Sequence, residues 1–124
     1  MSSVQTRVAA FLIAAGTALG AFGAHALKGR LEPEMLQIYH TAVFYHLVNA
    51  VGLLAASAVW SGCRAGAARI AALAIPAGIV IFSGSLYLLA VTGVRWLGAV
   101  TPIGGILLIG GWLSLAFASR KAAD

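Results

Sequence analysis

A short stretch of the chain, IYHTAVFYHLVNAV at residues 38–51, gathers side chains that can do chemistry in apolar surroundings. Histidine titrates near neutral pH, and tyrosine and asparagine both donate and accept hydrogen bonds. Inside a membrane such groups are costly unless each finds a partner, and they often mark a path for ions or solutes. The polar members of the stretch are Tyr39, His40, Tyr45, His46 and Asn49.

Helical spacing sorts these residues onto two faces. On a period of 3.6 residues, Tyr39, His46 and Asn49 share one face of the helix, whereas His40 lies on a different face. In a helix spanning 36–60, His46 and Asn49 lie about 2–3 Å from the bilayer midplane and His40 about 12 Å from it. We therefore expect His46 to be neutral inside the membrane and His40 to reach water.

Hydrogen-bond partners for His46 occur in the segment FSGSLY, residues 82–87, which reaches the same depth on an antiparallel helix. A neutral imidazole needs one donor and one acceptor, and a serine hydroxyl can serve as either. We predict a hydrogen bond from His46 to Ser83 or Ser85. Two interpretations stay open, a core histidine that fixes helix register or a path for a small solute or protons. The predicted intramembrane polar network comprises Tyr39, His46, Asn49, Ser83, Ser85 and Tyr87.

The composition places the chain in a membrane. Of its 124 residues, 61% are hydrophobic and only 9% are charged, and the mean hydropathy is +0.98. Charged residues make up roughly a quarter of ordinary soluble proteins, so three acidic and eight basic residues cannot cover a water-soluble surface. The basic residues are scattered singly or in pairs, and this pattern argues against a nucleic-acid surface.

Four segments are long and apolar enough to cross a bilayer, which requires about 20 residues each. They are 8–27, 36–60, 68–92 and 97–118, and they predict one all-α domain over residues 1–124, an up-down-up-down four-helix bundle. Five basic residues share the side of the termini and the middle loop, against three on the other side, so both termini are expected to be cytoplasmic. The five are Arg7, Arg64, Arg69, Arg120 and Lys121, and the three are Lys28, Arg30 and Arg95.

Small residues at four-residue spacing predict the helix contacts, because helices in lipid associate where their backbones approach closely. The first span offers Gly16, Gly20 and Ala24, and the fourth offers Gly110, Ser114 and Ala118. These stripes predict packing within the bundle, with a homo-oligomer interface as the alternative. Trp60 and Trp96 are expected to act as anchors at opposite membrane interfaces.

The side opposite the termini collects a second polar group, called here the outer-face cluster. Its charged pairs indicate a solvated rim, since exposed ion pairs are common and weak; the alternative is a mouth that leads toward His46. Within the cluster, His25 and His40 on successive helices form the one pair that could ligate haem between helices. The members of the outer-face cluster are His25, Glu32, Glu34, His40 and Arg95.

Three longer stretches, LGAFGAHALKGRL, YHLVNAVGLL and FSGSLYLLAVTGVRWLGAVTPIGGILLIGGW, resemble a known family. It is the small four-helix membrane protein family of unknown function that includes the bacterial YgdD and YwdK proteins, with eukaryotic relatives. The resemblance runs nearly end to end and is most specific at residues 82–87 and 101–105. It implies the four-span topology and a bacterial inner-membrane location, and it implies no biochemical activity.

No enzyme signature supports catalysis: the zinc-protease, P-loop and nucleophile-elbow motifs are all missing from the sequence, and no span contains a carboxylate. A single cysteine, Cys63, excludes paired-cysteine zinc sites, and no metal or cofactor is expected. We expect a non-enzymatic structural or accessory bundle that binds lipid or a partner membrane protein. The alternatives are an oligomeric channel or transporter that uses the polar network and, as a minor one, a haem-binding bundle.

Overall fold

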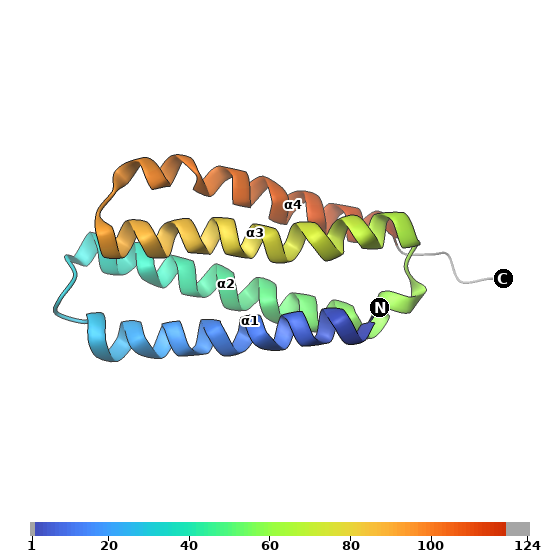
Figure 1. Ribbon diagram of the computed structural model, residues 1–124, viewed down its shortest axis with the longest axis horizontal. Helices are drawn as coiled ribbons and strands as arrows, with labels where there is room; N and C mark the ends of the chain where they lie inside the picture. Colours follow the sequence, from blue (N-terminus) through green and yellow to red (C-terminus); the bar gives the residue numbers. More distant parts are fainter. Residues whose placement is uncertain (1, 119–124) are drawn as a thin grey trace.

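The computed structural model describes residues 2–118, and in this part of the chain every regular element is a helix. The chain runs up and down four times, as the composition predicted (Figure 1). In order, the elements are α1 (Ser2–Phe22), a π-helical turn η1 (Gly23–Leu27), α2 (Pro33–Val59), a 3₁₀ turn η2 (Trp60–Gly62), α3 (Ala65–Thr92), a 3₁₀ turn η3 (Arg95–Ala99) and α4 (Thr101–Ala118).

The helix ends follow from local sequence chemistry. Pro33 opens α2 at its first turn, where the missing N–H leaves no hydrogen bond unmade. Gly93 ends α3 in the left-handed conformation, with φ of 73°, and donates its N–H to the Leu89 carbonyl.

The first three helices begin before the predicted spans do, so that Arg7 and Arg69 lie in the opening turns of α1 and α3. Long basic side chains tolerate this position because their stems lie along apolar surface while the charge reaches water.

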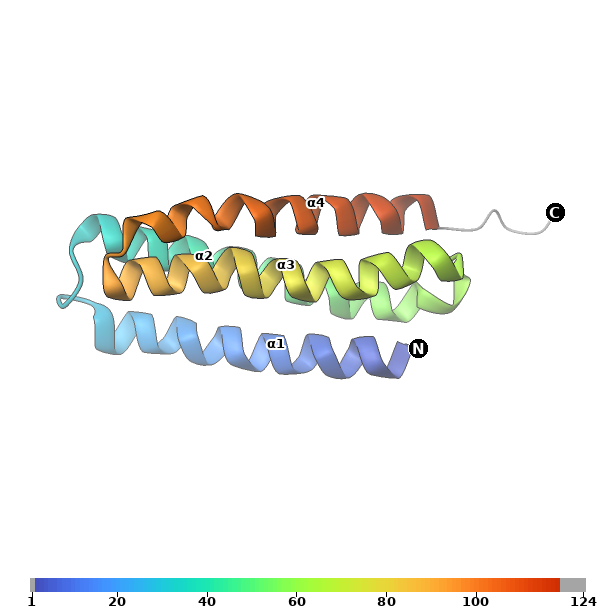
Figure 2. The same ribbon diagram turned by 45° about the horizontal axis from the view of Figure 1, so that its top comes forward.

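The four helices do not close into a square. Helices α2 and α3 lie at the centre, and α1 and α4 flank them on opposite sides (Figures 1 and 2). In the most apolar stretch of each helix, 39% of the residues of α2 and of α3 are buried, against 17% for α1 and for α4. The cross-section is therefore an open rhombus, in which α2 faces α4 across one groove and α1 faces α3 across another.

The contact between α1 and α2 depends on glycine. A Cβ on Gly16 would lie 2.7 Å from a Leu47 methyl group, and one on Gly20 would lie 3.2 Å from a Val43 methyl group. The line of contact continues to Gly23, which faces the ring of Tyr39. The prediction that Ala24 is the third contact residue is wrong, because Ala24 is exposed. Spacings of four and then three residues keep one face toward a partner helix, whereas repeated steps of four drift around the axis.

Helix α4 approaches α3 most closely at Gly104, where a side chain would collide with the backbone of Phe82. The contact continues through Leu108, which fits against Gly78, and through Gly111, whose Cβ would lie 2.7 Å from Ile75. The sequence prediction was one residue off here, because Gly110 is exposed and faces open space.

The other two members of the α4 stripe do lie against the bundle. Ser114 donates a hydrogen bond of 3.0 Å to the Ala67 carbonyl on α3, and Ala118 is fully buried. Together with Gly104 and Gly111 they show that α3 and α4 are in contact along the whole length of α4.

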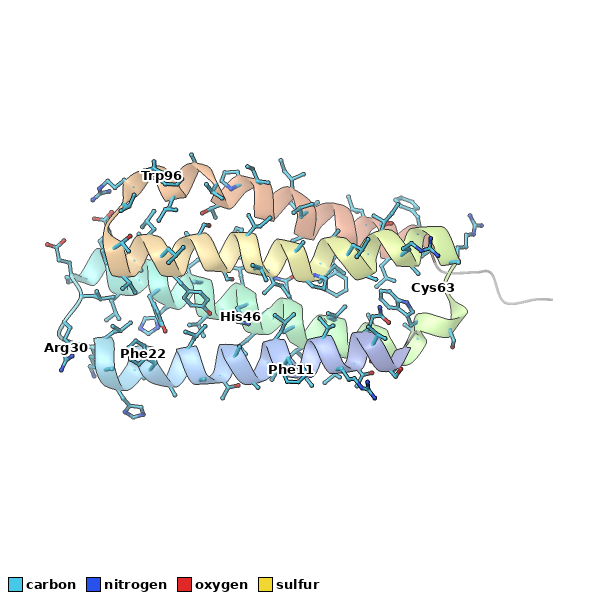
Figure 3. The ribbon with its side chains drawn as sticks, viewed as in Figure 1. Phe11, Phe22, Arg30, His46, Cys63 and Trp96 are labelled. Atoms are coloured by element: carbon cyan, nitrogen blue, oxygen red, sulfur yellow. The ribbon has the colours of Figure 1, made fainter. Side chains whose placement is uncertain are left out.

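Of the two tryptophans predicted to be interfacial anchors, only Trp96 is exposed. Trp96 is 68% exposed at the end of the bundle where α3 joins α4, as an interfacial anchor would be (Figure 3). Trp60, however, is only 2% exposed and belongs to the core with Leu53 and Ile75, so its predicted anchoring role is wrong. A turn at the end of α2 folds the indole inward instead of leaving it at the membrane surface.

The basic residues separate along the bundle axis. Arg30 lies at one end and Cys63 at the other (Figure 3). Lys28, Arg30 and Arg95 belong to the Arg30 end, and Arg7, Arg64 and Arg69 to the Cys63 end. Arg120 and Lys121, which complete the predicted cytoplasmic set, lie outside the described residues.

A matched pair of substitutions on α4 tests this packing. Gly104→Ala should lower the thermal midpoint in detergent, because overpacking at a close backbone contact costs about 1–3 kcal/mol. Gly110→Ala makes the same chemical change on the exposed face and should leave the midpoint unchanged or raise it slightly. Equal effects of the two variants would contradict the assigned face of α4.

Candidate functional site

The interior of the bundle holds one chain of polar side chains across three helices. His46 of α2 is 5% exposed and lies midway along the bundle, on the inner side of α2 (Figure 3). Its Nδ1 forms a hydrogen bond of 2.9 Å with the hydroxyl of Tyr87 on α3. Tyr87 in turn packs against Tyr39, with ring centroids 5.2 Å apart, and Tyr39 donates its hydroxyl proton to the Leu19 carbonyl on α1.

The second ring nitrogen of His46 faces α1. A Cβ on Gly16 would lie 3.2 Å from His46 Cδ2, the carbon next to Nε2, so glycine is what admits the ring there. Nε2 is buried and has no hydrogen-bond partner among the described residues. His46 is therefore held by one hydrogen bond, to Tyr87 on α3, and by packing against α1 at Gly16.

The serines are not partners of His46, and that part of the prediction is wrong. Ser83 donates to the Ala42 carbonyl at 2.8 Å. Ser85 is bonded to the hydroxyl of Thr101 on α4 at 2.6 Å and to the Phe82 carbonyl at 2.9 Å. Both serines are buried between helices, where they connect α3 to α2 and to α4.

Side-chain direction explains why tyrosine takes the place of serine. Helical side chains lean toward the N-terminus of their own helix. Because α2 and α3 are antiparallel, His46 leans toward the Arg30 end of the bundle and Tyr87 leans back toward the middle. A long phenol ring closes the remaining gap, which a serine hydroxyl is too short to cross.

Asn49 belongs to a different site from His46. Its Nδ2 donates to the Tyr45 carbonyl at 2.8 Å, and its Oδ1 accepts a hydrogen bond of 2.8 Å from the indole of Trp112 on α4. Gly52 makes room for that indole, since a Cβ there would lie 3.0 Å from the ring. Sequence reasoning missed Trp112 as a polar partner. The available signal was its indole N–H, which needs an acceptor at a depth where Asn49 offers a side-chain carbonyl.

The Asn49–Trp112 pair lies in the groove between α2 and α4, called here the α2–α4 groove. Its volume is about 480 Å³ and its walls are mostly apolar. Tyr45 is 43% exposed, and its hydroxyl makes no hydrogen bond to any described residue. The groove is lined by Tyr45, Asn49, Phe82, Gly105, Leu108, Ile109, Trp112 and Leu113.

The outer-face cluster is dispersed at the surface. Arg95 and Glu34 form an ion pair of 3.8 Å with both side chains more than half exposed, so it contributes little stability. His25 and His40 are both exposed, and no metal-binding group of three or more His, Cys, Asp or Glu side chains occurs in residues 2–118.

An apolar cluster separates this rim from His46. Leu27, Tyr39 and Ala90 are buried there and pack with Leu19 and Leu36. The structure therefore shows no open mouth from the rim to His46 among the described residues, and the cluster does not act as a vestibule in this conformation.

Comparison with known proteins identifies the family. The model of the family described as "Protein of unknown function (DUF423)" matches residues 19–105. The chain belongs to the DUF423 family. It is 43% identical over 111 residues to the UPF0382 membrane protein YwdK of Bacillus subtilis, with 89% of each chain covered. It is 46% identical over 112 residues to the UPF0382 membrane protein SERP0230 of Staphylococcus epidermidis, with 90% and 89% covered. No solved structure matches the chain significantly.

The DUF423 match includes the full interior chain of polar residues and the α2 side of the groove. It stops at residue 105, before Trp112. The family carries no assigned activity, so the function of this DUF423 protein has to be argued from its geometry.

A double-mutant cycle tests the His46–Tyr87 bond. His46→Leu and Tyr87→Phe should each destabilise the protein by about 1–2 kcal/mol, and the pair should be less than additive by about 0.6–1.7 kcal/mol. Tyr45→Phe is the matched control, because it removes a tyrosine hydroxyl that has no partner within residues 2–118. Chemical denaturation in a mixed micelle provides the measurement, and strict additivity of the two changes would contradict the bond.

Proposed function

We propose that this protein is a non-catalytic accessory bundle of the bacterial inner membrane that binds a lipophilic molecule from the side, in the α2–α4 groove. The observation that carries the proposal is the groove itself, with its mid-membrane polar groups. Lipid-binding sites in bundles lie between helices, are mostly apolar and contain a few placed hydrogen-bonding groups. The α2–α4 groove has this composition, and Asn49 and Trp112 hold each other in place at its floor.

The open rhombus supports lateral entry. Because α4 packs on α3 and not on α1, the groove beside α2 faces hydrocarbon and not a central channel. A molecule dissolved in the bilayer could enter without crossing the polar interface. Small residues also leave room at the groove wall, since a Cβ on Gly105 would lie 3.7 Å from Phe82, an ordinary contact distance.

Conduction through His46 is the competing function, and the geometry favours it less. The imidazole bonds to Tyr87 and packs against α1 at Gly16, and it lines neither of the two grooves. Its hydrogen bond to Tyr87 and its packing at Gly16 connect α2 to α3 and to α1, which is the arrangement expected of a histidine that fixes helix register.

The orientation with both termini in the cytoplasm belongs to this proposal. It rests on the five-to-three distribution of basic residues between the two sides. The similar proteins from Bacillus and Staphylococcus are bacterial membrane proteins by name and support the location.

Fluorescence quenching tests lateral binding. Trp112 lines the groove, so in a Trp96→Phe background a phospholipid with brominated acyl chains should quench its emission. Trp60, which is 2% exposed, supplies an unquenched baseline. Gly105→Leu should reduce the quenching by filling the groove, and Gly110→Leu, the same change on the exposed face of α4, should leave it as in the parent.

Equal quenching in both leucine variants would argue against an occupied groove. Proton or solute flux into liposomes above the protein-free background, abolished by His46→Gln, would favour conduction instead.

A further inference from the structure

The polar groups that remain unused in the α2–α4 groove are hydrogen-bond donors. Asn49 has two amide protons, of which one is given to the Tyr45 carbonyl, and its Oδ1 already accepts from Trp112. The two bonds fix which way the amide points, so the second N–H is available on a side chain that is only 8% exposed. The Tyr45 hydroxyl, one helical turn away, also has no partner among the described residues.

The depth of these donors restricts what can satisfy them. The middle of α2 is residue 46, so Tyr45 and Asn49 lie about 1.5 and 4.5 Å from it along the axis. The hydrocarbon core is about 30 Å thick, which places phospholipid ester and head groups about 15 Å away. Acyl chains carry no acceptor, and an unsatisfied donor in hydrocarbon is costly. The partner must bring an acceptor into the middle of the bilayer.

The walls of the groove also select a shape. Three aromatic side chains line it, and the rings of Tyr45 and Phe82 are in edge contact with centroids 5.0 Å apart. Aromatic faces bind flat conjugated rings well. The indole of Trp112 is held in position by Asn49, so it presents a fixed surface.

We propose that the α2–α4 groove binds a quinone-class lipophile, a flat ring whose carbonyl oxygens accept hydrogen bonds from the Tyr45 hydroxyl and the Asn49 amide, with its hydrophobic tail along α4. The inference rests on the proposed lateral binding function and names its ligand class. It concerns binding alone and includes no electron transfer. A quinone ring is compatible with the bilayer interior because it has acceptors and no donors that need partners of their own.

A pair of ligands distinguishes recognition of the quinone carbonyl oxygens from non-specific binding of an apolar molecule in the α2–α4 groove. Decylbenzoquinone and decylbenzene share the tail and a six-membered ring, and only the first has carbonyl oxygens. Binding is measured for the purified full chain in detergent by isothermal titration, with tryptophan emission in the Trp96→Phe background as a second readout of Trp112. The wild-type protein should bind decylbenzoquinone at least several-fold more tightly than decylbenzene.

Tyr45→Phe removes only the hydroxyl and should weaken decylbenzoquinone binding roughly three- to tenfold, the effect of one lost hydrogen bond, while leaving decylbenzene binding unchanged. Phe117→Leu alters a 77% exposed aromatic residue of α4 outside the groove and should change neither affinity. Circular dichroism verifies that both variants are folded.

The remaining outcomes are distinct. Quenching by brominated chains together with equal affinity for the two ligands would overturn the quinone inference and leave lateral lipid binding intact. If brominated chains do not quench Trp112 and neither decylbenzoquinone nor decylbenzene binds, both proposals are overturned. A Tyr45→Phe variant that loses a wild-type dimer would show that a second copy of the chain satisfies the donors, and would overturn the quinone inference.

Discussion

The close approach of α4 to α3 at Gly104 is the contact on which the open shape depends. With no side chain at that position, the backbone of Phe82 can lie directly against α4. Leu108 against Gly78 and Gly111 against Ile75 extend the same contact toward the other end. Because α4 packs closely on α3, it does not contact α1 as it would in a square bundle. The surface of α2 that a square bundle would bury is therefore left open as the α2–α4 groove.

Helix α2 therefore carries two polar systems on two faces. One face places Tyr39 and His46 between α1 and α3, where Tyr39 bonds to the Leu19 carbonyl and His46 bonds to Tyr87. The other places Tyr45 and Asn49 beside α4, where one amide N–H and one hydroxyl remain unused. The first system is suited to fixing helix register and the second to holding a ligand. His46, Tyr45 and Asn49 all lie near the middle of α2, at the depth where an unsatisfied polar group costs most.

The sequence predicted the features that depend on composition and on the depth of a residue in the membrane. It missed those that depend on how each helix is rotated about its own axis. Four spans follow from apolar runs, and Tyr87 was correctly expected near His46. His46 bonds to Tyr87 and not to Ser83 because side chains on antiparallel helices lean in opposite directions along the bundle. Residue depth alone does not predict this difference. Gly110 was chosen over Gly111 because a four-residue repeat ignores the drift of a helix around its partner. Trp60 was misplaced because the turn at residues 60–62 was not foreseen.

Distances between helices test the central claim, that α1 and α4 flank a central α2–α3 pair. Two double spin-label variants in a Cys63→Ser background suffice, one at Ala14 and Ile106 on α1 and α4, the other at Val48 and Val80 on α2 and α3. All four positions are exposed and lie near the middle of their helices. Pulsed electron paramagnetic resonance in lipid nanodiscs should give a clearly longer distance for the α1–α4 pair than for the α2–α3 pair. Equal distances, as in a closed square bundle, would contradict the open arrangement and the groove with it.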